Sequence, residues 1–170
     1  VGLYASILLF SASYYAIISP LHTYLSSQLD SILGSDTHKL KAILAYINRI
    51  QLIVILVIIT SITAFGYQLL LQIGQVYADL HEQLILCMLL FGLAIIFSPA
   101  IRILLHSTHQ QYASHLRVLQ LSATTILLVL LVPLYGVTGA ILADTLPLIC
   151  VHTWASIICY KRLSLNPLII

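Results

Sequence analysis

The chain has 170 residues, of which 61% are hydrophobic and only 7% are charged, and its formal net charge is +2. Soluble globular domains carry about 25% charged residues, and disordered chains combine low hydrophobicity with high charge, so this composition excludes both classes. We therefore expect an integral membrane protein, in which the positions of the few charges are more informative than their sum.

Five continuous apolar runs predict five transmembrane helices, at about residues 2–21, 50–73, 84–101, 118–135 and 137–160. Each run is close to the ~20 residues that a membrane-spanning helix needs, and none alternates as the strands of a barrel would. The first run is expected to close at Pro20, and Pro99 lies near the end of the third. The fold class that we predict is an all-α membrane protein.

The stretch Leu119–Cys150 predicts a tight membrane hairpin. Two apolar runs meet at Pro133-Leu-Tyr-Gly-Val-Thr-Gly139, and no Lys or Arg occurs between Arg117 and Lys161. Because helices joined by so short a turn must be antiparallel neighbours, we expect these two to lie side by side.

All Lys and Arg residues fall on one side of the five predicted spans. They are Lys39, Lys41, Arg49, Arg102, Arg117, Lys161 and Arg162, whereas a connector on the other side carries Asp79 and Glu82. The positive-inside rule makes the basic side cytoplasmic, which puts Val1 outside and Ile170 in the cytoplasm. A chain that starts outside and has no initiator Met is expected to be a C-terminal piece of a longer protein, with residues 1–170 forming one transmembrane unit.

The connector at about residues 35–48 predicts a short amphipathic helix on the cytoplasmic surface. Gly34 is expected to stop the preceding helix, and Ser35 or Asp36 to cap the new one. An apolar stripe follows at helical spacing, made of Leu40, Ile43, Leu44 and Ile47. Such a helix would lie in the membrane interface and lead into the second span.

The first span carries a polar stripe of Tyr4, Ser11, Tyr15 and His22. At about 100° per residue these side chains fall within about 20° of a single line along the helix. The stripe could line a water-filled cavity and bind a polar, sugar-bearing cargo. The alternative also stays open, in which Tyr4 and His22 lie at the membrane interfaces and Ser11 bonds its own helix.

Three further polar residues are candidates for a functional role. Asp144 is the only carboxylate inside a predicted span, and His152 lies deeper in the same span. An ionisable group at such a depth costs about 3 kcal/mol, so it should face the bundle interior or water. Asp144 could couple transport to a cation, or it could make a structural hydrogen bond between helices. His152 could relay a proton, or it could have a structural role. Arg49 is expected to snorkel to the headgroups or to face an anionic cargo.

Nothing in the sequence favours an enzyme. We find no nucleophile–base set, phosphate loop, dinucleotide fingerprint or nucleic-acid motif, so neither a cofactor nor a nucleic-acid partner is expected. Three histidines between the third and fourth runs are loosely spaced, without a carboxylate or thiolate among them, which favours a solvated loop over a metal site. The cysteines have no metal-ligand spacing and are expected to be small apolar core residues; they are Cys87, Cys150 and Cys159.

A succession of short segments is familiar in its order. The segments are Val1–Ala5, Ser19–Leu21, Asp36–Ala45, Ile73–Tyr77 and Val132–Ala140. In this order they resemble the C-terminal portion of polysaccharide and O-antigen flippases of the multidrug/oligosaccharidyl-lipid/polysaccharide exporter superfamily. The turn at Val132–Ala140 is the most specific of these matches.

The resemblance implies a twelve-helix, MATE-like transporter of two six-helix lobes, in which this chain would hold helices eight to twelve. The implied activity is the export, by alternating access, of a polyprenyl-pyrophosphate-linked oligosaccharide from the inner to the outer leaflet of the cytoplasmic membrane. The product would serve cell-surface polysaccharide such as lipopolysaccharide O-antigen. The implied partners are this lipid-linked oligosaccharide, the membrane lipids, and a polysaccharide polymerase and glycosyltransferases.

Two other functions remain open. One is a cation-coupled drug or metabolite antiporter of the same superfamily, for which Asp144 would be the coupling carboxylate. The other is a hydrophobic membrane subunit that transports nothing. A pyrophosphate cargo requires cations in the cavity, and because the five predicted spans offer almost none, we expect such cations in a part of the protein that precedes this chain.

Overall fold

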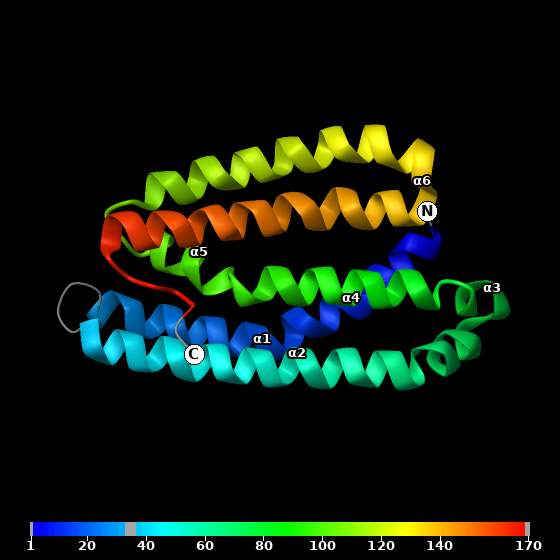
Figure 1. Cartoon of the computed structure of the whole chain (residues 1–170), viewed down its shortest axis with the longest axis horizontal. Helices are drawn as coiled ribbons and strands as arrows, with labels where there is room; N and C mark the ends of the chain where they lie inside the picture. The colour runs from blue at the N-terminus through cyan, green and yellow to red at the C-terminus, as the bar shows by residue number, and fades with distance from the viewer. Residues whose placement is uncertain (1, 33–36, 169–170) are drawn as a thin grey trace.

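The computed structural model describes residues 2–32 and 37–168, and within these ranges it contains helices and no strand. The elements are α1 (Gly2–Ile32), α2 (Thr37–Ile73), α3 (Gln75–Ala78), α4 (His81–Ile96), α5 (Ser98–Leu105) and α6 (Gln110–Leu163). Figure 1 shows the long helices running roughly along one axis of an elongated bundle. The all-α fold class is thereby confirmed.

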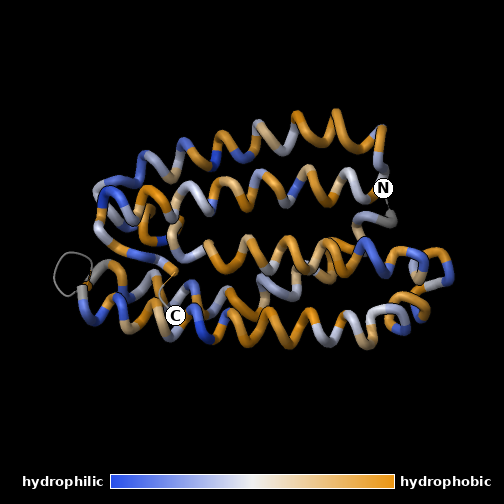
Figure 2. Tube along the Cα trace, viewed as in Figure 1, coloured by the Kyte–Doolittle hydropathy of each residue, from blue (hydrophilic) through white to orange (hydrophobic). Residues whose placement is uncertain are grey.

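Within the described residues, four stretches are long and apolar enough to cross a membrane: Tyr4–Leu29, His38–Ile73, His81–Leu105 and Gln110–Leu163. Figure 2 shows hydrophobic residues along the middle of the helices and hydrophilic ones gathered toward their ends. This distribution is compatible with a membrane-embedded protein. The count of five spans and the membership of a six-helix lobe stay predictions.

The predicted hairpin is present, because α6 reverses direction at Gly136 (Figure 1). Gly136 has φ 57° and ψ −125°, the dihedral angles of the first central residue of a type II′ turn, which glycine favours. The two helical parts of α6 on either side of Gly136, a first arm (110–135) and a second arm (137–163), lie side by side. They approach closely: a Cβ atom at Gly139 would lie 2.2 Å from the carbonyl oxygen of Leu131.

Helix α1 does not close at Pro20, and this expectation from the sequence was wrong. The helix continues to Ile32 with Pro20 inside it. A proline removes one backbone hydrogen bond and disfavours a helix interior, yet tertiary packing can outweigh that cost. Leu25 and Leu29, both fully buried beyond the proline, supply such packing.

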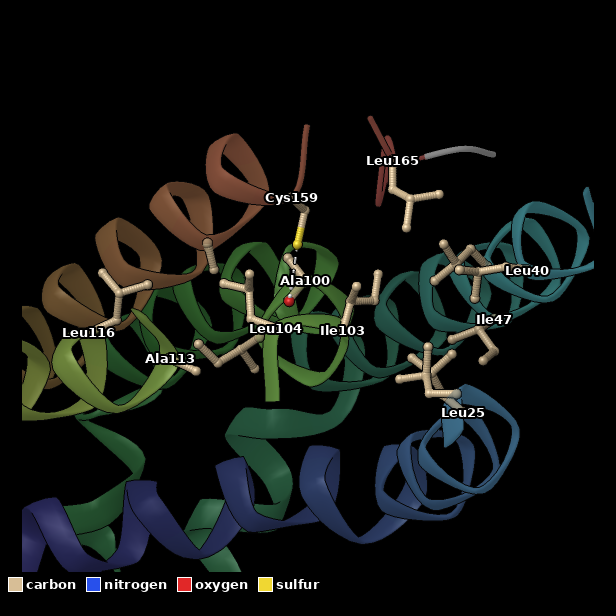
Figure 3. Packing of buried hydrophobic residues seen from close by; sticks show 14 of the residues in the cluster. Leu25, Leu40, Ile47, Ala100, Ile103, Leu104, Ala113, Leu116, Cys159 and Leu165 are labelled. Carbon is tan, nitrogen blue, oxygen red and sulfur yellow. Dashed lines mark hydrogen bonds between the residues drawn. The ribbon is translucent and has the colours of Figure 1, made fainter. Parts of the chain in front are cut away.

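The separate amphipathic surface helix was also wrong. Helix α2 runs without interruption from Thr37 to Ile73, and the expected stop and cap at residues 34–36 lie outside the described residues. The apolar stripe at the start of α2 is buried, because Leu40, Leu44 and Ile47 are at most 1% exposed. These side chains pack with residues of α1 and α5, as Figure 3 shows around Leu25 and Ile103. The stripe therefore faces the protein's own core and not a lipid surface.

The third apolar run is divided into two helices. Helix α4 ends at Ile96, and α5 begins at Ser98 with Pro99 in its first turn, where a proline costs no hydrogen bond. Apart from Arg102 and Leu105, the residues of α5 are buried. The break thus packs a short helix against α6 and places Arg102 beside the interior of the bundle.

Candidate functional site

Four buried polar side chains lie where two hydrophobic clusters meet. Among the described residues, one cluster includes Leu25, Ile47, Ala100 and Ala155, and the other includes Ile18, Ile55, Ile95 and Leu148. On each of four helices, a polar residue stands in sequence between members of the two clusters. These residues are His22 of α1, Gln51 of α2, Ser98 of α5 and His152 of α6, and none is more than 9% exposed.

His22 connects three of these helices. Its Nε2 atom lies 2.9 Å from the amide nitrogen of Gln51 and 2.9 Å from the hydroxyl oxygen of Ser98. An amide nitrogen can only donate, so His22 Nε2 accepts at this contact and the neutral ring carries its proton on Nδ1. The hydroxyl of Ser98 has one proton, and it donates this proton to the carbonyl oxygen of Ile95 at 2.6 Å. The cluster fixes the orientation of the His22 ring.

His152 of α6 is held by a backbone hydrogen bond to another helix. Its Nδ1 atom lies 2.9 Å from the carbonyl oxygen of Ala94 in α4. A carbonyl oxygen can only accept, so Nδ1 carries a proton and donates it. The other ring nitrogen, Nε2, is buried and has no hydrogen-bond partner among the described residues. A buried polar atom without a partner is uncommon and calls for an explanation.

A cavity of about 340 Å³ adjoins both histidines. We call it the basic cavity, because two arginines line it, Arg102 from α5 and Arg117 from the first arm of α6. Its other polar walls come from α1, α5 and the second arm of α6, and they are Tyr15, Ser19, His22, Ser98 and His152. The guanidinium group of Arg117 donates to the side-chain oxygen of Gln120 at 2.9 Å.

A second cavity of about 280 Å³ contains the only carboxylate of the predicted spans. We call it the acidic cavity; Ser11, Tyr15, Gln120 and Asp144 contribute its polar lining. The hydroxyl of Tyr4 donates to Asp144 Oδ2 at 3.4 Å, which joins α1 to α6. Tyr15 and Leu148 line both cavities, so the two adjoin each other. Tyr15 also packs edge-on against Phe91, with ring centroids 6.1 Å apart.

The structure brings together most of the residues that the sequence singles out. Tyr15 and His22 line the basic cavity, while Ser11, Tyr15 and Asp144 line the acidic cavity, with Tyr4 bonded to Asp144. Ser11 also donates to the carbonyl oxygen of Leu8 in its own helix at 2.8 Å. Arg49 does not join them, because its side chain is exposed and lines neither cavity.

The sequence reasoning missed the two arginines of the basic cavity. The five predicted spans contain no Lys or Arg, and Arg102 and Arg117, each one residue outside a predicted span, line this cavity. Both residues had been assigned to a connector, whereas they lie within α5 and α6 and flank the short link at residues 106–109. Because so short a link makes α5 and α6 neighbours, its length was the feature of the sequence that could have predicted that the two arginines lie close to the same cavity.

Within the described residues, no group of three metal-ligating side chains occurs, and the histidines at 106, 109 and 115 do not form one. The three cysteines are free thiols. Cys87 and Cys159 are buried as expected, but Cys150 is exposed, so the expectation of a core position was wrong for it. Comparison with models of known protein families, with curated proteins and with solved structures finds no match for this chain.

Proposed function

We propose that this chain is part of a transporter that moves a polyprenyl-pyrophosphate-linked oligosaccharide from the inner to the outer leaflet of the cytoplasmic membrane. The basic cavity is the observation that carries the proposal. Two guanidinium groups, Arg102 and Arg117, line it among apolar helices. Guanidinium groups match the oxygens of phosphates in charge and in geometry, and they are rare at such positions unless they face a polar ligand.

The other walls of the two cavities suit the remaining parts of such a cargo. Tyrosine and serine hydroxyls both donate and accept hydrogen bonds, as sugar hydroxyls do, and Tyr15 offers a ring to both cavities. The polyprenyl chain would stay in the lipid beside the exposed apolar faces of the helices. Alternating access of the cavity to the two sides of the membrane would then transfer the head group.

Complementation tests this proposal. The natural gene that encodes this chain is expressed in a bacterial strain that lacks its own O-antigen flippase, and surface polysaccharide is measured. We expect the wild type to restore it, and Arg102→Gln and Arg117→Gln each to lower it at least about tenfold, which corresponds to about 1.4 kcal/mol of lost interaction. Arg49→Gln is the matched control, because this arginine is exposed outside both cavities, and it should behave as the wild type.

Wild-type levels of surface polysaccharide in both cavity variants would overturn the proposal. Failure of the wild type itself, with the protein present in the membrane, would favour a subunit that transports nothing. Since a lipid-linked oligosaccharide is made by glycosyltransferases and consumed by a polymerase, these enzymes are the partners that we expect beside it.

A second candidate function is favoured by one observation, the hydrogen bond from Tyr4 to Asp144 beside the acidic cavity. A carboxylate in such a place could bind a coupling cation, as a drug or metabolite antiporter requires. Protection of cells against toxic cationic compounds, lost in Asp144→Asn and kept in Arg102→Gln, would support this function. The reverse pattern would support the flippase.

A further inference from the structure

The unpartnered nitrogen of His152 is the feature that leads beyond the proposed transport activity. His152 is 6% exposed and lines the basic cavity, and within the part of the chain that the structure describes its Nε2 atom has no hydrogen-bond partner. Because Nδ1 must donate to Ala94, the neutral ring presents a lone pair at Nε2. The structure therefore places a buried proton acceptor, and not a donor, in the wall of a cavity that two arginines make attractive to anions.

An anion cannot satisfy an unprotonated nitrogen. Oxygens of phosphate or sulfate accept hydrogen bonds, and a lone pair on Nε2 would repel them. If Nε2 takes a proton, however, it becomes a charged donor and makes a strong hydrogen bond to an oxyanion. A proton in the empty cavity would add a third positive charge to those of Arg102 and Arg117, and a bound dianion removes this repulsion.

Several elements contribute titratable, charged or polar groups around His152. Tyr15 and His22 come from α1, Arg102 from α5 and Arg117 from the first arm of α6, while α4 contributes the carbonyl oxygen of Ala94. His22 differs from His152, because its Nε2 is already occupied by Gln51 and Ser98. The Nδ1 atom of His22 already carries its proton, so of the two histidines His152 is the one whose buried, unpartnered nitrogen has a lone pair that can take up a proton.

We propose that the basic cavity binds a tetrahedral oxyanion together with one proton, and that His152 Nε2 holds this proton. The proton comes from solvent, one N–H bond forms at Nε2, the proton on Nδ1 stays, and the anion is bound without covalent change. When the anion leaves, the same proton returns to solvent. The inference rests on the anion-binding part of the proposed function and adds to it a fixed proton stoichiometry at a named atom.

Binding of sulfate to the purified natural protein in lipid nanodiscs tests this inference. Sulfate is a suitable probe because it stays fully ionised between pH 5 and 8, so any proton taken up belongs to the protein. Isothermal titration calorimetry in buffers of different ionisation enthalpy counts these protons. We expect uptake of up to one proton per sulfate, and an affinity that rises by up to about tenfold for each pH unit lowered.

Two variants assign the proton. In His152→Asn, an amide nitrogen can still donate to Ala94 but cannot titrate, so we expect sulfate binding without proton uptake and without pH dependence. In His22→Gln, the cavity keeps its titrating group, so the pH dependence should remain. A pH dependence that survives in His152→Asn, or that disappears in His22→Gln, would overturn the inference.

The outcomes separate this inference from the function on which it rests. Sulfate binding that depends on Arg102 but not on pH would leave the anion site in place and overturn the proton site. Absence of sulfate binding by the wild type at every pH would overturn both. A neutral sugar that binds more tightly at high pH and loses affinity in His152→Asn would identify Nε2 as an acceptor for a hydroxyl, which also contradicts the inference.

Discussion

At the scale of single residues, the cluster around His22 combines structure with a place beside the cavity. His22 accepts from Gln51 and contacts Ser98, and all three side chains are buried between apolar neighbours. A hydrogen bond inside an apolar bundle adds little to the free energy of unfolding. A buried polar group that loses its partner, however, destabilises the protein by the full cost of its desolvation. The cluster therefore specifies how α1, α2 and α5 pack together.

Replacement of His22 by leucine should destabilise the protein by about 1–3 kcal/mol, because the buried amide of Gln51 loses its acceptor. Thermal unfolding in detergent measures the effect. Thr23→Val is the matched control one residue further along α1, where the exposed hydroxyl bonds only its own helix, and it should change little. The double variant His22→Leu/Gln51→Leu should lose less than the two single variants together. Equal melting temperatures of His22→Leu and Thr23→Val would contradict this account.

At the scale of elements, the hairpin of α6 depends on two glycines for different reasons. Gly136 has a positive φ and open space around it, so a side chain there would meet backbone strain alone. Gly139 has no such dihedral angle, but a side chain there would collide with the backbone of the first arm. The backbone cannot move aside as the end of a flexible side chain can.

We expect Gly136→Ala to cost about 1–3 kcal/mol through strain and Gly139→Ala to cost at least as much, because the two arms must separate. Protease resistance and the melting temperature of the purified variants measure both effects. Thr138→Ala, between the two glycines, is the control and should stay close to the wild type. A stable, protease-resistant Gly139→Leu protein would show that the arms do not need this close contact.

The elements also show what the sequence could and could not predict. The turn of α6 was predictable, because glycine acts through local backbone geometry, but the turn lies at Gly136 and Pro133 is inside the first arm. The end of the first helix at Pro20 was not, since the packing of Leu25 and Leu29 outweighs the local preference. The stripe at Leu40 and Leu44 indicated an amphipathic helix correctly, but periodicity alone does not say whether a stripe faces lipid or protein.

At the scale of the whole molecule, the two ends of the bundle differ in charge. The start of α1, α3 and the turn of α6 lie at one end in Figure 1, and the link between α5 and α6 lies at the other. Lys39 and Lys41 at the start of α2 and Lys161 at the end of α6 belong to the second end, whereas Asp79 belongs to the first. We propose that the basic end is cytoplasmic.

Cysteine labelling tests this orientation. In a protein whose native cysteines are replaced by alanine, Asp79→Cys should react with a membrane-impermeant maleimide added outside intact cells. Thr108→Cys, at an exposed position of the link between α5 and α6, should react only after the membrane is opened. The opposite labelling pattern would show that the protein has the reverse orientation.

The composition of the cavities could be predicted only in part at this scale. Tyr15, His22 and Asp144 were recognisable because each interrupts an apolar run. The meeting of Arg102 with Arg117 depends on the break before α5 and on the packing of α5 against α6, and neither is encoded in a local pattern. The orphan nitrogen of His152 likewise follows from its contact with Ala94, which lies 58 residues away in the chain.

The tight turn of α6 has a consequence for the insertion of the newly made protein into the membrane. From Val118 to Tyr160 the hairpin carries one carboxylate and no Lys or Arg, so little charge must cross the membrane with the turn. Almost every backbone group of the two arms is already paired within its own helix. We expect the two arms to insert into the bilayer together as a folded hairpin, with Arg117 and Lys161 holding its two open ends at the membrane surface. This insertion would precede the packing of α6 against the other helices that forms the cavity.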